Sequence, residues 1–382
     1  MSPVSRKEYV QAILKRYHVA DRCEKSRILD EFCRICGYHR KHAIAKLRQT
    51  RQPKRARRKP GRVSRYRKPE IMVVLQRIWQ TAHYPCSKRL KAILACWIEP
   101  YEQTFGILPG WVKQALAKIS PSTIDRLLVQ ERLRVKRKGL STTKPGTLLK
   151  HHIQVKTNQW DEQRPGFLEA DTVAHCGTSM AGQFVFSLDL TDIATGWTEQ
   201  RAIWGKGERG VLEQIVSIEA ALPFRILGFD CDNGGEFLQW HLVRYFQERP
   251  NPVQFTRSRP YQKNDNAHVE QKNWTHVRQW LGYQRFDNPA LVERLNDLYS
   301  SEWRLLHNFF LPSAKLTSKE RRRSKIIKVH DNPKTPYQRI LDSAYIPQRV
   351  KDTLTDLYHT LNPFPLRKAI DAHITHIRKL AR

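Results

Sequence analysis

The chain has 382 residues, 40% of them hydrophobic, and its 68 Lys and Arg against 36 Asp and Glu give a net charge of +32. This charge predicts a polyanionic partner, for which nucleic acid fits best and an anionic membrane surface is the distant alternative. The apolar runs are too short for the roughly 18–20 residues of a transmembrane helix, and the seven cysteines lack the spacing of a secreted scaffold. We therefore expect a reduced, cytoplasmic protein of roughly two to four domains.

Residues 1–48 are predicted to form a small helical DNA-binding domain. Apolar residues at helical spacing indicate three helices, and a turn at Gly37 joins the second to the third. Two short helices with basic residues along the outer edge of the second are typical of a helix-turn-helix domain, and a plain three-helix bundle is the alternative. The outward residues that we expect to contact DNA are Arg40, Lys41 and Arg48.

The same domain contains a pattern of two cysteines and two histidines that invites a zinc interpretation. The residues are Cys33, Cys36, His39 and His42. Zinc modules of this type separate the two ligand pairs by roughly 12–15 residues, whereas only two residues lie between Cys36 and His39. Because Cys33 also falls on the apolar stripe of its helix, we interpret it as a buried structural cysteine.

Two basic segments are predicted to be linkers, at 49–70 and 134–159. The stretch from 48 to 68 has eleven basic residues, no acidic ones, and several Pro and Gly breakers. Such a composition predicts a flexible segment that follows the phosphate backbone of DNA.

Residues 71–133, between these linkers, are predicted to form a second helical domain in the style of a helix-turn-helix. Ser120 is expected to cap its last helix, because Pro121 fits the first helical position. Thr123 and Arg126 then project from the opening turns of this helix and are further candidates for DNA contact.

From residue 160 to 312 the pattern changes to strands alternating with helices. The strands are predicted at 166–176, 182–196, 197–205, 224–232 and 253–258. Three strands in a meander followed by alternating helices and strands predict a mixed α/β sheet covered by helices.

The region from 313 to 382 is basic, and its last part is predicted to be helical. Contact with DNA and contact with another subunit are open alternatives for its role.

Three acidic residues of this central segment lie in unusual positions. Asp171 is inside an apolar strand, and Asp232 ends another strand before an Asn-Gly turn. Glu270 falls on a predicted apolar helix stripe with Ala267, Trp274, Val277 and Leu281. Singly, each has an ordinary explanation as a turn or a surface ion pair. Together, carboxylates at central positions of a strongly basic protein indicate two-metal phosphoryl transfer, which needs hard oxygen ligands around two cations.

The segment from 160 to 345 resembles the catalytic core of prokaryotic insertion-sequence DDE transposases, which is similar to that of retroviral integrases. The resemblance is carried by "EADTV" with Asp171, "DCDNGGEF" with Asp232, and "RPYQKNDNAHVEQKNW" with Glu270. Sixty residues separate the first two acids and 37 the last two, close to the family's roughly 35 for the second interval. The fold that it implies is an RNase H-like mixed sheet with flanking helices.

This resemblance implies that Asp171, Asp232 and Glu270 ligate two Mg²⁺ or Mn²⁺ ions. The activity that it implies is nicking of the element's terminal inverted repeats to leave a 3′-OH, which then attacks a target-DNA phosphate in one transesterification. Lys263 matches a basic position that contacts the end DNA, and Asp265 or Asn266 is expected to cap the helix of Glu270. A homo-oligomer is expected on DNA, because two element ends must be processed together.

Two neighbouring acids compete for these assignments. Asp230 shares its strand face with Asp232, and Glu169 shares one with Asp171, so either can be a supporting group beside the ligands. His268 is interpreted as a packing or DNA-contact residue rather than a general base. The alternative functions are a domesticated helix-turn-helix DNA-binding protein and a metal-dependent nuclease without strand transfer.

Overall fold

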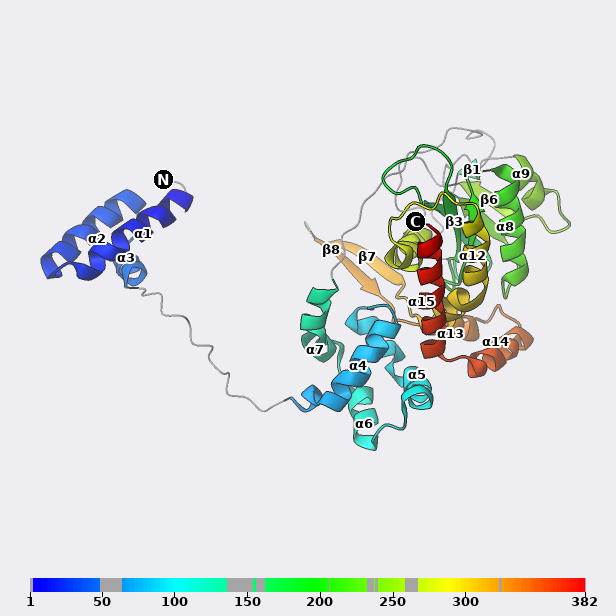
Figure 1. Ribbon diagram of the computed structural model, residues 1–382, viewed down its shortest axis with the longest axis horizontal. Coiled ribbons are helices and arrows are strands. Elements are labelled where there is room, and N and C mark those ends of the chain that lie inside the picture. Colours follow the sequence, from blue (N-terminus) through cyan, green and yellow to red (C-terminus); the bar gives the residue numbers. More distant parts are fainter. Residues whose placement is uncertain are drawn as a thin grey trace. The chain divides into compact units, whose positions relative to one another are not determined.

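The computed structural model describes residues 3–48, 64–135, 154–155, 162–205, 207–231, 237, 240–257, 267–322 and 325–381. The chain divides into two compact units, Met1–Ser64 and Arg65–Arg382, each of which is described by itself (Figure 1). The predicted linkers at 49–70 and 134–159 lie mostly outside the described residues.

The first unit consists of three helices, as predicted, namely α1 (Pro3–Val19), α2 (Arg22–Cys36) and α3 (Arg40–Leu47). The side chain of Asp21 caps α2 by accepting the N–H of Glu24 at 2.8 Å. Gly37 ends α2 with a φ of +69°, the left-handed conformation that glycine adopts without strain.

The interpretation of Cys33 as the buried cysteine of this unit was wrong. Cys33 is half-buried, whereas Cys36 is buried, because the apolar stripe of α2 runs in steps of four from Ile28 through Phe32 to Cys36. The side chain of His39 begins α3 by accepting the N–H of Lys41.

The second unit begins with η1 (Arg65–Arg67), followed by a helical block of α4 (Pro69–Thr81), α5 (Ser87–Phe105), α6 (Gly110–Lys118) and α7 (Pro121–Arg134). The predicted start of α7 is confirmed. Ser120 Oγ accepts the N–H of Thr123 at 3.2 Å, and Pro121 occupies the first turn of the helix.

A mixed sheet follows the helical block, and its five predicted strands are confirmed with shorter bounds. The strands are β1 (Gln154–Val155), β2 (Phe167–Ala174), β3 (Val185–Asp192), β4 (Thr198–Trp204), β5 (Gly228–Cys231) and β6 (Gln254–Arg257), in the order β1-β6-β5-β2-β3-β4. β2, β3 and β4 pair antiparallel, whereas β5 and β6 run parallel to β2. If the two-residue β1 is left out and β2 to β6 are counted as strands 1 to 5, the order across the sheet is 3-2-1-4-5. This order is consistent with an RNase H-like topology.

The two faces of the sheet are covered by different helices. One face packs on α8 (Glu208–Ala221) and α9 (Trp240–Gln247) through residues such as Leu168, Ala170 and Leu188. Alternate residues, among them Val173 and Val185, face the helices that follow β6. These are α10 (Ala267–Lys272), the π-helical η2 (Asn273–Arg278), α11 (Gln279–Leu281), α12 (Ala290–Leu298), η3 (Tyr299–Trp303) and η4 (Leu306–Phe310).

The rest of the second unit is a hairpin and three helices that complete this core. They are β7 (Leu316–Arg322), β8 (Lys325–His330), α13 (Pro336–Asp342), α14 (Gln348–Thr360) and α15 (Pro363–Leu380). The helical tail was predicted. Side chains of the block α4–α7, the sheet and α13–α15 belong to one hydrophobic core, so these three segments form a single unit.

Buried hydrogen bonds fix the helical layer to the sheet at His175, which follows β2. His175 Nε2 lies 2.7 Å from Ser187 Oγ on β3, which lies 2.6 Å from the hydroxyl of Tyr299 in η3. The imidazole also stacks on Phe286 at a centroid distance of 4.7 Å. Burial lowers the pKa of His175 to about 3, so its side chain is neutral at physiological pH.

We predict that His175 makes the stability of the protein sensitive to acid. The unfolded chain gains a proton at this position near pH 6.5 while the folded chain does not, so the stabilisation is lost as the pH falls below about 6.5. Between pH 6 and pH 4, the free energy of unfolding of the wild type minus that of His175→Gln is expected to fall by about 1.4 kcal/mol per pH unit. Urea unfolding followed by Trp fluorescence measures both curves, and parallel curves contradict the assignment.

Candidate active site

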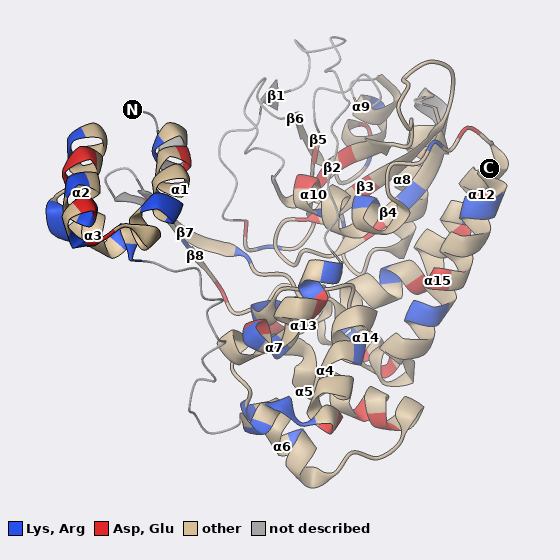
Figure 2. Ribbon diagram, turned by 60° about the vertical axis from the view of Figure 1, so that its left-hand side comes forward, with Lys and Arg blue, Asp and Glu red and all other residues tan. Residues whose placement is uncertain are grey.

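The candidate site lies where β2 meets α10. Glu169, Asp171 and Val173 share the face of β2 that packs on the helical layer, as the alternation predicted. Figure 2 shows acidic residues gathered on β2, β5 and α10 near the middle of the sheet, while basic residues are spread over the helices. What distinguishes the acids of this region is that Glu169, Asp189 and Asp230 are buried in the sheet.

Glu169 caps α10 from the neighbouring strand. Its Oε2 accepts the N–H groups of His268 and Val269, each at 3.0 Å, and the residue is only 1% exposed. The first N–H groups of a helix have no partner within the helix, and a carboxylate there also interacts favourably with the helix dipole. Glu169 thus attaches the start of α10 to β2, two residues from Asp171. The cap expected at Asp265 or Asn266 lies outside the described residues.

Asp171 makes the second attachment between the strand and the helix. Asn273 Nδ2 donates to Asp171 Oδ2 at 2.6 Å, and the N–H of Thr172 donates to Oδ1 at 2.7 Å. Asn273 lies three residues after Glu270, one turn along the same continuous helical segment. The structure therefore brings Asp171 together with the helix that carries Glu270.

Glu270 is not on the buried face of this helix, which corrects the predicted stripe. Glu270 is exposed, and Trp274 is 38% exposed, so it does not hold the helix against the sheet as the stripe predicted. Val277 and Leu281 of the predicted stripe are buried, as expected, and the other buried residues of the helix are Val269, Lys272, His276 and Trp280. The stripe was misplaced because two polar residues take core positions and because the wider turns of η2 change the spacing.

Asp232 lies outside the described residues, but the strand that leads to it is described. β5 ends at Cys231, which pairs in parallel register with Ala170, the residue before Asp171. The competing acid Asp230 is buried and accepts a hydrogen bond from Thr256 Oγ1 at 2.6 Å, which ties β5 to β6.

A buried polar group beneath the site was not predicted. Asp189 pairs with Asp171 in the register of β3 and β2, and it is fully buried. Burial raises its pKa, and the positive charge of Lys272 opposes that shift. Lys272, only 5% exposed, has its pKa lowered by burial and lies 3.3 Å from His276 Nε2. Lys272 on the helix of Glu270 and Asp189 on β3 thus influence each other's pKa, while hydrogen bonds join the helix to β2.

The donor atoms at this site suit a hard divalent cation. Within the described ranges, no cluster of three or more His, Cys, Asp or Glu side chains is placed to hold a metal ion, and Asp232 is not among those residues. Asn273 Oδ1 is buried next to Asp171 and accepts no hydrogen bond from any described residue. Carboxylate and amide oxygens are the ligands that Mg²⁺ and Mn²⁺ prefer. The oxygen atoms of Asp171, Glu270 and Asn273 therefore match such an ion in donor chemistry.

The comparisons with known proteins place the chain in a family. No family model matches it. The uncharacterized protein y4rM of Sinorhizobium fredii is 36% identical to it over 344 residues, which cover 89% of this chain and 96% of that protein. The chain belongs to the y4rM family. The aligned region of 344 residues is longer than the second compact unit, Arg65–Arg382. The similarity to y4rM therefore reaches into the first unit as well.

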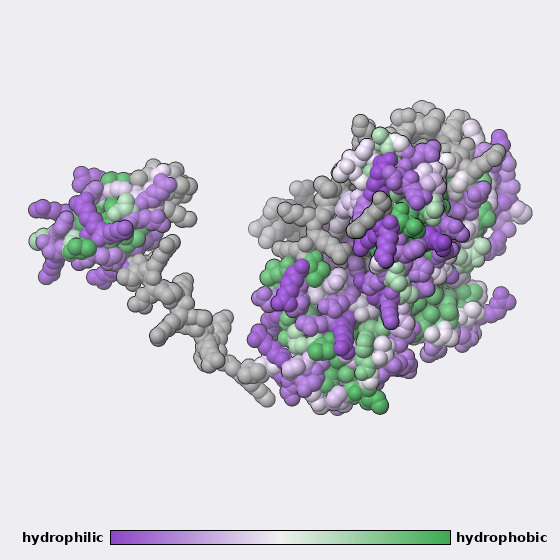
Figure 3. All heavy atoms as spheres, in the orientation of Figure 1, coloured by the Kyte–Doolittle hydropathy of each residue, from purple (hydrophilic) through white to green (hydrophobic). Residues whose placement is uncertain are grey.

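The predicted DNA contacts of this y4rM family member are on the outside of their helices. Lys41 and Arg48 are exposed on the first unit, but the guanidinium of Arg40 is bound to Asp30 and to Ser26 Oγ, so it also ties α3 to α2. Figure 3 shows a mainly hydrophilic visible surface on this unit.

In the second unit, Arg126 is exposed on α7 and donates to Thr123 Oγ1 at 3.2 Å. Lys263 lies outside the described residues. No helix in the described part of the chain is long and apolar enough to cross a membrane.

We predict that the stability of α10 depends on how well residue 169 accepts hydrogen bonds from the first N–H groups of the helix. Glu169→Ala leaves two N–H groups without their acceptor and is expected to lower the free energy of unfolding by about 2–3 kcal/mol. Glu169→Gln keeps an acceptor oxygen and is expected to cost less. Amide hydrogen exchange across 267–272 is expected to accelerate in the Ala variant more than in the Gln variant, and unchanged exchange in both contradicts the capping role.

Proposed function

We propose that the chain is a DDE transposase that nicks the ends of a DNA element and joins them to target DNA. The observation that carries the proposal is the contact of Asn273 with Asp171, because it puts the Glu270 helix beside the strand of the first acid. The order of the sheet strands supports the RNase H-like core that such enzymes use. The net charge of +32 supports DNA as the partner.

Asp171, Asp232 and Glu270 are the residues that would hold two Mg²⁺ or Mn²⁺ ions. When bound, such a pair of ions activates the attacking oxygen and stabilises the leaving oxygen of a phosphodiester. The protein supplies the positions of the carboxylates, since Glu169 and Asn273 fix the helix of Glu270 on β2. The Glu270 side chain is exposed, so DNA can reach it from solvent.

The helical parts of the chain supply recognition in this proposal. The three helices of the first unit and α7 of the second carry exposed basic residues, among them Lys41, Arg48 and Arg126, which suit phosphate contact along element ends and target DNA. Two ends must react together, so a homo-oligomer assembled on DNA is part of the proposal.

We predict that Asp171→Asn, Asp232→Asn and Glu270→Gln each abolish Mg²⁺-dependent nicking and joining while leaving DNA binding unchanged. The substrate is a labelled duplex that carries the ends of the DNA element encoding the chain. An amide keeps the shape of the side chain but removes the charge that a divalent cation needs, so a loss of at least roughly 10³-fold is expected.

The matched control is Asp356→Asn, which removes an exposed carboxylate from α14 and is expected to react at the wild-type rate. Joining by any of the three site variants at the wild-type rate contradicts the proposed site. Nicking without joining by the wild type supports the nuclease alternative instead.

A further inference from the structure

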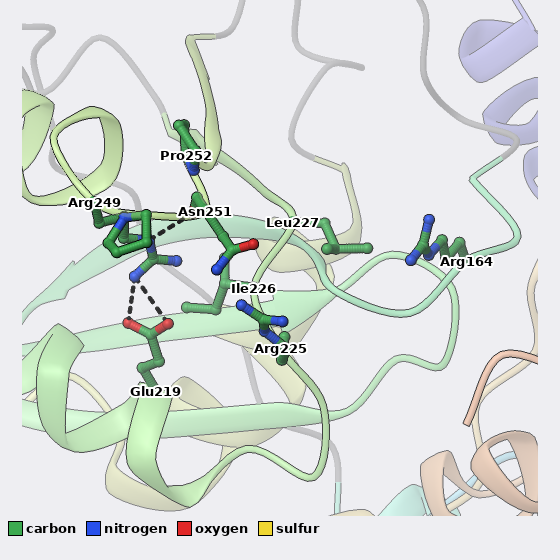
Figure 4. A pocket seen from close by; sticks show the side chains of 9 residues that line it. Arg164, Glu219, Arg225, Ile226, Leu227, Arg249, Asn251 and Pro252 are labelled. Carbon is green, nitrogen blue, oxygen red and sulfur yellow. Dashed lines mark hydrogen bonds and ion pairs between the residues drawn. The ribbon is translucent and has the colours of Figure 1, made fainter. Parts of the chain in front are cut away.

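A pocket of about 440 Å³ opens at the edge of the sheet where β2, β5 and β6 begin. Three arginines line it, namely Arg164, Arg225 and Arg249, together with Glu219 and the loop Pro250–Pro252 (Figure 4). β5 carries the chain away from this edge towards Asp232, so the pocket is at the opposite end of the parallel strands from the candidate active site. At about 3.3 Å per residue, Asp171 is roughly 13 Å along β2 from Phe167, and Arg164 precedes the start of this strand.

The three arginines differ in what they bind. Arg249 is held by Glu219, with both carboxylate oxygens 3.0 Å from its Nη1, and its Nε donates to the carbonyl of Asn251. Arg164 and Arg225 are exposed, and no acidic side chain within the described ranges forms an ion pair with either. The nearby acid Glu162 accepts the backbone N–H of Arg164 at 3.4 Å rather than its guanidinium. The pocket is therefore lined by two guanidinium groups that pair with no carboxylate of the described residues.

The backbone places these two arginines next to each other. Gly166 O accepts the N–H groups of Leu227 and Gly228, at 2.8 and 3.1 Å, which joins the segment after Arg164 to the segment after Arg225. Gly166 has a φ of +115°, and a Cβ there would lie 2.4 Å from the carbonyl oxygen of Arg225. The buried carboxylate of Asp192 accepts the N–H of Gly166 at 2.7 Å. The backbone from which the two arginine side chains extend is thus fixed by the core.

A second pocket of about 350 Å³ is lined by Gln163 and Pro165, the neighbours of Arg164. The cations of this second pocket, unlike Arg164 and Arg225, form ion pairs. Its cations are Lys334 and Arg339, and each has an acidic partner at 2.7 Å, Asp342 and Asp331 respectively. Of these two pockets, only the one with Arg164 and Arg225 combines space with guanidinium groups that form no ion pair within the described ranges.

We propose that the pocket of Arg164 and Arg225 binds backbone phosphates of duplex DNA that are distinct from the phosphate at the candidate active site. Guanidinium groups bind phosphate oxygens through paired N–H donors, and open solvent access suits a phosphodiester with its flanking sugars. This assignment depends on the proposed function for its ligand, DNA, and is independent of the chemistry at Asp171.

The test compares full-length double variants for binding to a duplex of random sequence as a function of salt concentration. Arg164→Ala/Arg225→Ala is expected to weaken binding at least about tenfold, and to reduce the slope of log K against log [salt] by about 1 to 2. Arg164→Lys/Arg225→Lys keeps the charge and is expected to keep the slope.

The matched control is Arg349→Ala/Lys368→Ala, which removes two exposed cations from α14 and α15 and is expected to change the slope by less than half as much. An equal effect of the control and pocket variants overturns the proposal, because the pocket then contributes only to net charge. A third outcome also overturns the proposal: inorganic phosphate binds saturably only when both arginines are present, while the Ala double variant binds duplex DNA as the wild type does. The pocket is then a small-anion site. If the wild type does not bind duplex DNA, the proposed function fails as well.

Discussion

The carboxylate of Glu169 at the start of α10 is the interaction on which the candidate site depends. A buried carboxylate is costly to desolvate unless its charge is met by donors, and here two backbone N–H groups at a helix start meet it. The bond fixes where the helix begins along β2. Once that point is set, Asn273 reaches Asp171 and Glu270 lies one turn earlier, at the surface. Lys272 is then buried, and its Nζ lies 3.3 Å from His276 Nε2.

This arrangement separates the residues that hold the site from those that could act in it. Glu169, Lys272 and Asp189 are buried and bind protein groups, whereas Glu270 is exposed. A metal ligand must remain accessible to the ion and the substrate. Its orientation is therefore fixed by hydrogen bonds among buried neighbouring residues. The π-helical η2 begins at Asn273, whose amide donates to Asp171, while the preceding Lys272 is buried.

Much of the fold was predictable, because apolar and polar residues alternate along β3 and because helices have clear starts such as Ser120 and Pro121. The acids of the candidate site, Asp171, Asp232 and Glu270, were chosen from the sequence. The contacts that attach the Glu270 helix to β2 were not predicted. Alternation along β2 placed Asp171 on the correct face. The stripe on the Glu270 helix was misread because Lys272 and His276 have polar side chains and yet are buried, and local periodicity counts such residues as surface. Glu169 was noticed only as a neighbour, since a cap supplied from another strand leaves no signal in the sequence of the helix.

The shared core of the second unit has a consequence for how the chain folds during synthesis. Phe364 in α15 packs against Trp97, Tyr101 and Phe105 of α5, and Asn362 Nδ2 donates to the carbonyl of Pro100. These partners are more than 250 residues apart in the sequence. The helical block that leaves the ribosome early must therefore wait for α15 before its apolar surface is covered, which exposes the nascent chain to chaperones and to aggregation. Removal of α15 would uncover the aromatic residues of α5, so the stability of the early helical block depends on a helix that is synthesised more than 250 residues later.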